Sequence, residues 1–599
     1  MSQKKNQKEK TPKFSLGYFK YFYQFIGNHI FTYLFLNFLI GFLDAIGITL
    51  FVPLLALATG TEAGGSLGEM QFVIDKMNAY GIVLNLAICL AMMVSVFLVK
   101  GFFYYIRIVY FGYIRRLAIR NIRIKLINNF GKLSYEGFTH FDIGRIQSDM
   151  TTSVDRIGNA MTFYFYVFQD IIMIFAYLFM AVTLNWQFSI LVVIGGYLTN
   201  FIYNYINKIT KEISKKNVRL SFNFMGNLVQ SIQNFKYLKA TNYFNILRLK
   251  LISNILEGNK LDFRQSKINA LSEGLREPLI IIVISAVMLM EYYIFKQGIA
   301  SMMVGLLMFY RCLGCLVTVQ RSWNNFLATS ANIESVDDIL EDFREFKEPE
   351  FSDEITEIDD IEVKNVKVQF DSKVVLQDIN FHIPKLSSVA FVGESGAGKT
   401  TLANVICGLQ FPHLGGVYTN GKNIYETNLD SYRSKIGYIT QEPVIFNDTV
   451  FNNITFWQPQ TPENLEKFHR VLHMVSMYDF VGGLDKKGDA MLGHSGILVS
   501  GGQKQRISIA RELYKDVDLL IMDEATSALD SETEQHIKQS IDMLQGKFTI
   551  VIIAHRLSTI KNVDKIHLLE EGKITGSGNF QELKEKSEKF SRMVAMQEL

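Results

Sequence analysis

Long apolar stretches dominate the first 340 residues of this 599-residue chain. A helix needs about 20 mainly apolar residues to cross the hydrocarbon layer of a bilayer. Stretches of about that length recur six times, near residues 30–58, 83–109, 159–183, 187–206, 274–295 and 299–320. The sequence therefore predicts an all-α polytopic membrane domain over residues 30–340, with six long transmembrane helices.

Proline is scarce in this half, since only three of the nine prolines precede residue 349. Helices without proline can continue uninterrupted. The connecting segments 110–158 and 207–273 are too long for turns, so we expect helices two to five to extend beyond the bilayer. Their tips should lie near 137–158 and 234–245. The aromatic-rich run 14–25, within an N-terminal segment 1–29, indicates a helix in the membrane interface.

Basic residues are distributed unevenly around these spans. Lysines and arginines cluster at the N-terminus and in both long connecting segments, whereas the opposite loops hold almost none. Cytoplasmic loops of membrane proteins carry this excess. We therefore expect a multi-pass membrane protein with both chain ends in the cytoplasm.

Overall composition excludes several classes of protein. Lys plus Arg number 61 against 58 Asp plus Glu, a net charge of +3, which is not the charge of a polybasic nucleic-acid binder. Four cysteines cannot build a disulfide scaffold. The mean hydropathy of +0.14 fits a chain with one apolar half and one polar half.

The composition changes after an acidic linker at 341–360. Beyond it, over 361–599, short apolar β-rich runs alternate with helical patterns, which favours a mostly parallel sheet covered on both faces. The run SVAFVGESGAGKTTL contains GxxxxGK[ST] between a strand and a helix. This is the P-loop pattern, which predicts an α/β P-loop NTPase domain that binds ATP and Mg²⁺.

The chemistry of a P-loop explains its residue types. Glycines let successive backbone N–H groups surround phosphate oxygens, the lysine reaches the β- and γ-phosphates, and the threonine hydroxyl binds Mg²⁺. The predicted phosphate-binding residues are Gly393, Glu394, Ser395, Gly396, Ala397, Gly398, Lys399, Thr400 and Thr401. A later apolar strand ends in Asp523 and Glu524. We expect Asp523 to hold Mg²⁺ and Glu524 to act as catalytic base toward the attacking water.

The run VSGGQKQR at 499–506 nearly reproduces the signature sequence of the ATP-binding cassette superfamily, which the C-terminal half resembles throughout. The resemblance implies that Phe370 stacks on adenine and that Gln441 senses Mg²⁺ and the attacking water. It also implies that His555 is the γ-phosphate switch and that Asp530 belongs to the segment after the catalytic base. One departure is His494, at a position where the family's exporters usually have glutamate.

The same resemblance implies a partner. In that family two cassettes close head to tail, so that Ser500, Gly501, Gly502 and Gln503 of one face the P-loop of the other. Backbone donors before a helix suit such a phosphate contact. One chain has one P-loop and one signature, so we expect a homodimer with two equivalent ATP sites.

Asp44 and Arg311 are the clearest charged residues inside the predicted spans, whereas Arg107 and several others lie closer to span ends, where they can extend to the interface or pair. Charges in a membrane are costly and are candidate functional sites, although a structural pair between helices is an equal alternative here. Both stretches resemble the first and sixth spans of bacterial flippases for lipid-linked oligosaccharides. By that resemblance, and because a guanidinium suits phosphate, Arg311 would meet a lipid pyrophosphate headgroup. The same resemblance implies a bacterial inner (plasma) membrane.

These features predict an ATP-hydrolysing transporter of exporter type, which exports or flips an amphipathic substrate such as a lipid-linked glycan or another lipid. A multidrug or peptide exporter is the alternative within the class. An ATP-gated channel or regulator on the same fold is an alternative of another class, and no nucleic-acid partner is expected.

Overall fold

The computed structural model describes residues 16–51, 54, 85–184, 186–274, 277, 278, 281, 282, 285, 289, 299–523, 542–554 and 556–597. The chain divides into two compact units. The first comprises Met1–Leu133 with Gly137–Lys347, and the second comprises Ser134–Glu136 with Glu348–Leu599. The boundary after Lys347 lies within the segment 341–360 that the sequence indicates as a linker.

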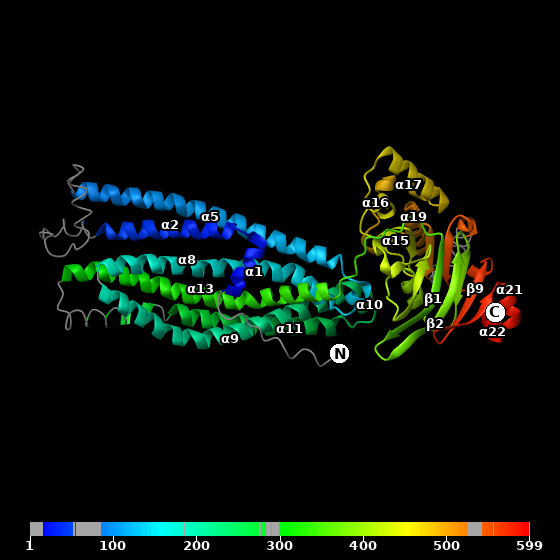
Figure 1. Cartoon of the computed structure of the whole chain (residues 1–599), viewed down its shortest axis with the longest axis horizontal. Helices are drawn as coiled ribbons and strands as arrows, with labels where there is room; N and C mark the ends of the chain where they lie inside the picture. The colour runs from blue at the N-terminus through cyan, green and yellow to red at the C-terminus, as the bar shows by residue number, and fades with distance from the viewer. Residues whose placement is uncertain are drawn as a thin grey trace. The chain divides into compact units, whose positions relative to one another are not determined.

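The N-terminal half is helical, and its long helices run side by side (Figure 1). The long helices are α1 (Leu16–Ile26), α2 (His29–Thr49), α5 (Leu86–Phe130), α8 (Val154–Leu184), α9 (Trp186–Gln233), α11 (Phe244–Gly274) and α13 (Ile299–Glu345). Short helices connect them: α6 (Tyr135–Thr139), α7 (Ile143–Ser148), the π-helix η1 (Asp149–Ser153) and α10 (Phe235–Ala240).

Several of these helices are long and apolar enough to cross a membrane. Among the described residues, three stretches meet this condition by length and composition, namely His29–Thr49, Leu86–Phe130 and Ile143–Phe179. Helices α5, α9 and α13 also continue far beyond a 20-residue span, as expected from the scarcity of proline. Most of the predicted span 274–295 lies outside the described residues.

The connecting tips lie near their predicted positions. The first turn begins directly after Phe130 and contains α6 and α7, so it starts earlier than the predicted 137–158. Within this turn the Asp142 side chain accepts a hydrogen bond from the backbone N–H of Arg145 and so caps the start of α7. The second tip coincides with α10, inside the predicted 234–245.

Helix α1 corresponds to the aromatic run 14–25, but most of its rings are buried in protein, with Tyr23 exposed. Phe22 is fully buried, and Tyr18 makes edge-to-face contact with Phe326 of α13 at a centroid distance of 4.8 Å. Tyr33 of α2 and Phe165 of α8 join the same core. These aromatic contacts therefore stabilise the packing of α1 on the bundle. The predicted position of α1 in the membrane interface stays a prediction.

The C-terminal unit contains two sheets. The first has strand order β2-β1-β4-β5 and is antiparallel. Its strands are β1 (Asp360–Phe370), β2 (Lys373–Pro384), β4 (Leu414–Thr419) and β5 (Lys422–Asn423). The second has strand order β10-β9-β3-β8-β7-β6. Its strands are β3 (Ser388–Val392), β6 (Ile436–Ile439), β7 (Leu519–Asp523), β8 (Thr549–Ile553), β9 (Lys565–Glu570) and β10 (Lys573–Gly578).

All neighbours in the second sheet are parallel except β9 and β10, which confirms the predicted mostly parallel sheet. Strands β3, β7 and β8 are buried along their whole length, as continuous apolar runs predict. The helices of this unit are α14 (Lys399–Ile406), α15 (Leu429–Ser434), α16 (Val450–Thr455), α17 (Pro462–Met474), α18 (Tyr478–Gly482), α19 (Gly501–Tyr514), α21 (Phe580–Lys586) and α22 (Glu588–Gln597), with 3₁₀ turns η3 (Ile424–Glu426), η4 (Lys487–Asp489), η5 (His494–Gly496) and η6 (Leu557–Ile560).

Candidate functional site

The predicted phosphate-binding loop joins β3 to α14. Gly398, just before the helix, has φ +100°, and Gly396 has φ +84°, a region that favours glycine. A Cβ on Gly398 would approach Leu376 Cδ2 at 2.8 Å and the carbonyl oxygen of Val375 at 3.0 Å. A Cβ on Gly393 would lie 2.1 Å from the carbonyl oxygen of Leu569. Close packing of backbones therefore requires the first and last glycines of the motif.

Lys399 is the first residue of α14 and is largely buried. Its Nζ donates hydrogen bonds to the carbonyl oxygens of Gly393, at 2.8 Å, and Glu394, at 3.0 Å. The ammonium group is thus held over the loop, in reach of any anion bound by the loop's N–H groups. The N-terminus of the helix adds a favourable dipole for phosphate.

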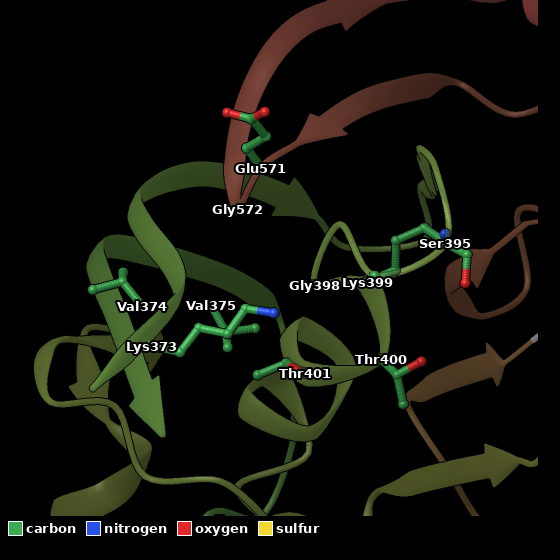
Figure 2. A pocket seen from close by; sticks show the side chains of 11 residues that line it. Lys373, Val374, Val375, Ser395, Gly398, Lys399, Thr400, Thr401, Glu571 and Gly572 are labelled. Atoms are coloured by element: carbon green, nitrogen blue, oxygen red, sulfur yellow. The ribbon is translucent and has the colours of Figure 1, made fainter. Parts of the chain in front are cut away.

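A cavity of about 510 Å³ opens beside this loop (Figure 2). Ser395, Gly396, Gly398, Lys399, Thr400 and Thr401 line it, all of them predicted from the motif. The remaining lining residues are Lys373, Val374, Val375, Glu571 and Gly572. In Figure 2 the residues of β2 and those of the loop lie on opposite sides of the cavity. The cavity is concave and is lined both by lysine side chains and by apolar side chains, and a nucleotide requires both kinds of contact.

The sequence motifs did not identify these five additional residues. They come from the start of β2 and from the turn between β9 and β10, which contain no recognised motif. The Glu571-Gly572 pair after an apolar strand is a turn signal, and Gly572 has φ +77°. A Cβ on Gly572 would lie 2.3 Å from the carbonyl oxygen of Val375, so the turn is pressed against β2.

Phe370, the residue implied to stack on adenine, ends β1 and pairs in register with Lys373 of β2. It is 44% exposed and is not among the residues that line the cavity. Because Lys373 does line it, the ring stands at the edge of the cavity. The position suits a flat base that enters from solvent.

The other predicted residues of the hydrolytic site lie at the carboxyl ends of the parallel strands. Strands β3, β8, β7 and β6 are parallel neighbours, so the P-loop, Asp523 and Gln441 all lie at or just after strand ends at one edge of the sheet. Asp523 is largely buried and accepts a hydrogen bond from the Tyr438 hydroxyl at 3.3 Å. Burial, and then the charge of Asp523, raise the pKa of Tyr438, which keeps the phenol neutral and donating.

The oxygen donors at this edge fit a magnesium ion. Mg²⁺ prefers hydroxyl, carbonyl and carboxylate oxygens and usually keeps several waters. Thr400 offers an exposed hydroxyl beside the cavity, and Asp523 and Gln441 offer a carboxylate and an amide oxygen. Among the described residues no cluster of three or more His, Cys, Asp or Glu could hold a metal alone. The predicted set therefore needs phosphate oxygens and water to complete a shell.

Three predicted residues, Glu524, Asp530 and His555, lie outside the described residues. Strand β7 ends at Asp523, directly before Glu524, and β8 ends at Ile553. The catalytic roles assigned to Glu524 and His555 stay predictions.

The signature residues begin α19. Ser500 is the N-cap, and its hydroxyl accepts a hydrogen bond from the N–H of Gln503 while the Gln503 side chain accepts one from the N–H of Ser500. This capping box fixes the first turn and leaves Gly501 exposed with open space around it. None of Ser500, Gly501, Gly502 and Gln503 lines the described cavity. His494, in η5 shortly before the signature, is exposed.

Asp44, a predicted substrate residue, is engaged by other side chains of the helical unit. It is 2% exposed on α2, where its carboxylate pairs with Lys100 of α5 and accepts a hydrogen bond from the Tyr177 hydroxyl of α8. Arg311 of α13 is exposed in the single chain. The pairing of Asp44 with Lys100 favours the structural alternative for this residue.

Arg107, near the end of the predicted span 83–109, is a second buried charge in the same unit. Arg107 of α5 is 5% exposed and donates hydrogen bonds to Gln169 of α8 and to Asn37 of α2, the latter at 3.2 Å. Its guanidinium also lies over the Tyr104 ring, 4.4 Å from the centroid. Arg107 is therefore a buried cross-link between helices, and its side chain does not extend to an interface.

Two family profiles match this chain. The one described as "ABC transporter transmembrane region" matches residues 30–317, and the one described as "ABC transporter" matches residues 376–527. The fold is also that of a solved bacterial Atm1-family ABC exporter with ATP bound. The two structures align with a TM-score of 0.78 at 22% identity, over 96% of this chain and 99% of that chain.

Similar curated proteins are named ATP-dependent lipid A-core flippase. The one from Syntrophus aciditrophicus (strain SB) is 30% identical over 499 residues, which cover 81% of each chain. The one from Desulfotalea psychrophila is 26% identical over 92% of this chain and 97% of that chain. The protein therefore belongs to the ABC transporter family, as an exporter-type half-transporter with a transmembrane domain and an ABC ATPase domain that couples ATP hydrolysis to transport.

Proposed function

We propose that two copies of this chain form a homodimeric flippase that moves a lipid-linked glycan, or another lipid with a phosphorylated headgroup, across a bacterial inner membrane. The observation that carries the proposal is the similarity to proteins named ATP-dependent lipid A-core flippase along most of both chains. Six spans per copy, with both chain ends in the cytoplasm, are part of the proposal and rest on hydropathy and on the distribution of basic residues.

Two copies are needed because one cassette separates the two halves of an ATP site. The P-loop lines the cavity, whereas the exposed start of α19 at Ser500 and Gly501 does not. In the dimer, the N–H groups of this second helix end would bind the γ-phosphate from across the interface. Closure of the two cassettes would then require ATP in both sites.

Hydrolysis follows from the residues at the sheet edge. Lys399 binds the β- and γ-phosphates, and Phe370 stacks on the base. Mg²⁺, held by Thr400, Asp523 and Gln441, would neutralise charge on the phosphates. Glu524 orients and deprotonates the attacking water, and His555 contacts the γ-phosphate.

The substrate headgroup would meet Arg311. Its guanidinium is exposed on α13, and this side chain offers paired donors for a phosphate. Asp44 is a weaker candidate for substrate binding, because its carboxylate already pairs with Lys100 and accepts a hydrogen bond from the Tyr177 hydroxyl.

Reconstitution in proteoliposomes tests the function directly. A fluorescent polyprenyl-diphosphate glycan is placed in the membrane, and its loss from one leaflet is followed by chemical quenching of the outer leaflet. We expect ATP-dependent flipping that Glu524→Gln abolishes while ATP stays bound. Transport of hydrophobic drugs or peptides without flipping of the glycolipid would contradict the proposal, as would a passive ion current gated by ATP.

The Arg311 contact has its own test. In nanodiscs, the phosphorylated lipid should stimulate ATP turnover several-fold in the wild type. Arg311→Ala should reduce the ratio of stimulated to unstimulated turnover to about one, and Arg311→Lys should restore part of it. A ratio unchanged in Arg311→Ala would remove Arg311 from the headgroup site.

A further inference from the structure

The P-loop of this chain contains an acidic residue next to the position of the triphosphate. Glu394 follows the first glycine of the motif, and its side chain is 71% exposed. Its backbone carbonyl oxygen lies 3.0 Å from Lys399 Nζ, so the residue stands close to the principal phosphate-binding cation. A carboxylate here repels the phosphates and lowers the affinity for ATP unless another charge compensates it.

Lys589, from the C-terminal helix α22, supplies that charge. Its Nζ lies 3.0 Å from Glu394 Oε1 and 3.2 Å from Glu570 Oε1 at the end of β9. The hydrogen bonds with Glu394, and next with Glu570, raise the pKa of Lys589 above its usual value. The cation therefore stays charged throughout the range in which the protein works.

Helix α22 is held firmly enough to keep Lys589 in place. Phe590, the next residue, is fully buried against Phe580, and Val594 is 2% exposed. At the other end of the helix, the Gln597 side chain accepts a hydrogen bond from the N–H of Leu557, at 2.8 Å. The helix thus contacts both the P-loop and the segment that follows β8.

We propose that Lys589 is a positioning residue for ATP, which neutralises Glu394 and orients it away from the triphosphate. The C-terminal helix thereby sets the affinity of the P-loop for nucleotide without contacting the reacting atoms. The pair is partly exposed, so its contribution should be modest and should weaken as salt screens the charges.

The test is ATPase kinetics of the full-length protein in nanodiscs. Lys589→Met should raise the KM for ATP about threefold to tenfold with kcat within about twofold of the wild type, because the lost charge acts on binding. Lys589→Arg should keep the wild-type KM. The double variant Glu394→Gln/Lys589→Met should return KM to within about twofold of the wild type, since the P-loop then has no carboxylate beside the phosphates.

Arg592→Met is the matched control, because it removes a cation of the same helix that pairs with Glu588 on that helix. Its KM should stay at the wild-type value. High salt should narrow the difference in KM between Lys589→Met and the wild type. An unchanged KM in Lys589→Met, a fall in kcat alone, or a double variant no better than the single one would each overturn the proposal.

Discussion

Lys399 Nζ lies 2.8 Å from the carbonyl oxygen of Gly393, six residues earlier, so the P-loop closes on itself through the lysine side chain. The loop can take this path because Gly398 adopts φ +100° immediately before α14. The geometry of the phosphate site therefore depends on a residue that offers no side chain.

Gly398→Ala should abolish high-affinity ATP binding. The left-handed conformation costs a non-glycine residue about 1–2 kcal/mol, and the new Cβ would also press on Leu376 and Val375. We expect at least a tenfold rise in the Kd for ATP, measured with a fluorescent nucleotide. Gly396→Ala is the control, because its φ is also positive but nothing lies within 4 Å of its Cβ. Equal effects of the two substitutions would show that steric contact at Gly398 is unimportant.

The P-loop was predictable because its signal is local. Consecutive residues set the turn, the backbone donors and the start of α14, and the structure brings those residues to one cavity. Lys373 and Glu571 were not predictable, since they reach the same cavity from strands far apart in the chain. Their placement depends on the contact between the β9–β10 turn and β2, where the carbonyl group of Gly572 accepts a hydrogen bond from Gln377 N–H at 2.8 Å.

In the helical unit, too, contacts between segments far apart in the chain were not predictable from the sequence. Hydropathy predicts long helices, and their extension beyond a single span follows from the scarcity of proline. Neither hydropathy nor the scarcity of proline shows which helix faces pack together, so the partner of Asp44 could not be identified from the sequence. Lys100 is a charge within the predicted span 83–109, but its pairing with Asp44 follows only from the packing of α2 on α5.

Lys100→Met should destabilise the helical unit. Removing one partner of a buried ion pair typically costs about 3–5 kcal/mol, because the other charge stays buried, although the Tyr177 hydroxyl remains to bind Asp44. We expect a clear fall in the Tm of the protein in nanodiscs. The double variant Asp44→Asn/Lys100→Met should be more stable than Lys100→Met alone. Arg120→Met, which removes an exposed cation from the same helix, should leave the Tm unchanged.

A double variant less stable than Lys100→Met would contradict this account, since both charges would then contribute independently. Loss of lipid-stimulated turnover in Asp44→Asn, with the Tm unchanged, would instead return Asp44 to the substrate site.

Arg433→Lys should lower the stability of the cassette. The Arg433 guanidinium binds both carboxylate oxygens of Glu348, at 2.6 and 2.7 Å, and also the carbonyl oxygen of Gly408 at 2.5 Å. A lysine cannot reproduce this planar arrangement, so we expect a loss of about 1–3 kcal/mol in the free energy of unfolding of the cassette. Trp457 fluorescence in a Trp186→Phe/Trp323→Phe background reports that transition. Arg470→Lys, at an exposed pair with Glu466, is the control and should change it little.

The cassette should lose stability in mild acid because of His567. This ring is 2% exposed, stacks on Phe391 at a centroid distance of 5.4 Å, and pairs through Nδ1 with the Ser577 hydroxyl at 2.6 Å. Burial, assisted by the charge of Lys565, lowers the pKa of His567 from 6.5 to about 4. The unfolded chain therefore binds a proton at a higher pH than the folded chain does.

Because the unfolded chain takes up this proton at the higher pH, the free energy of unfolding decreases as the pH falls. The contribution of His567 to stability is complete above pH 6.5, falls as the pH drops toward 4, and is constant below it, with a total loss of about 3 kcal/mol. Denaturant unfolding of the full chain in the same Trp186→Phe/Trp323→Phe background, followed through Trp457 between pH 4 and 7.5, measures this slope. The double variant His567→Phe/Ser577→Ala keeps an aromatic ring in place and should flatten the profile, whereas His469→Gln, at an exposed histidine, should not. If the slope persists in the double variant, groups other than His567 cause the acid sensitivity.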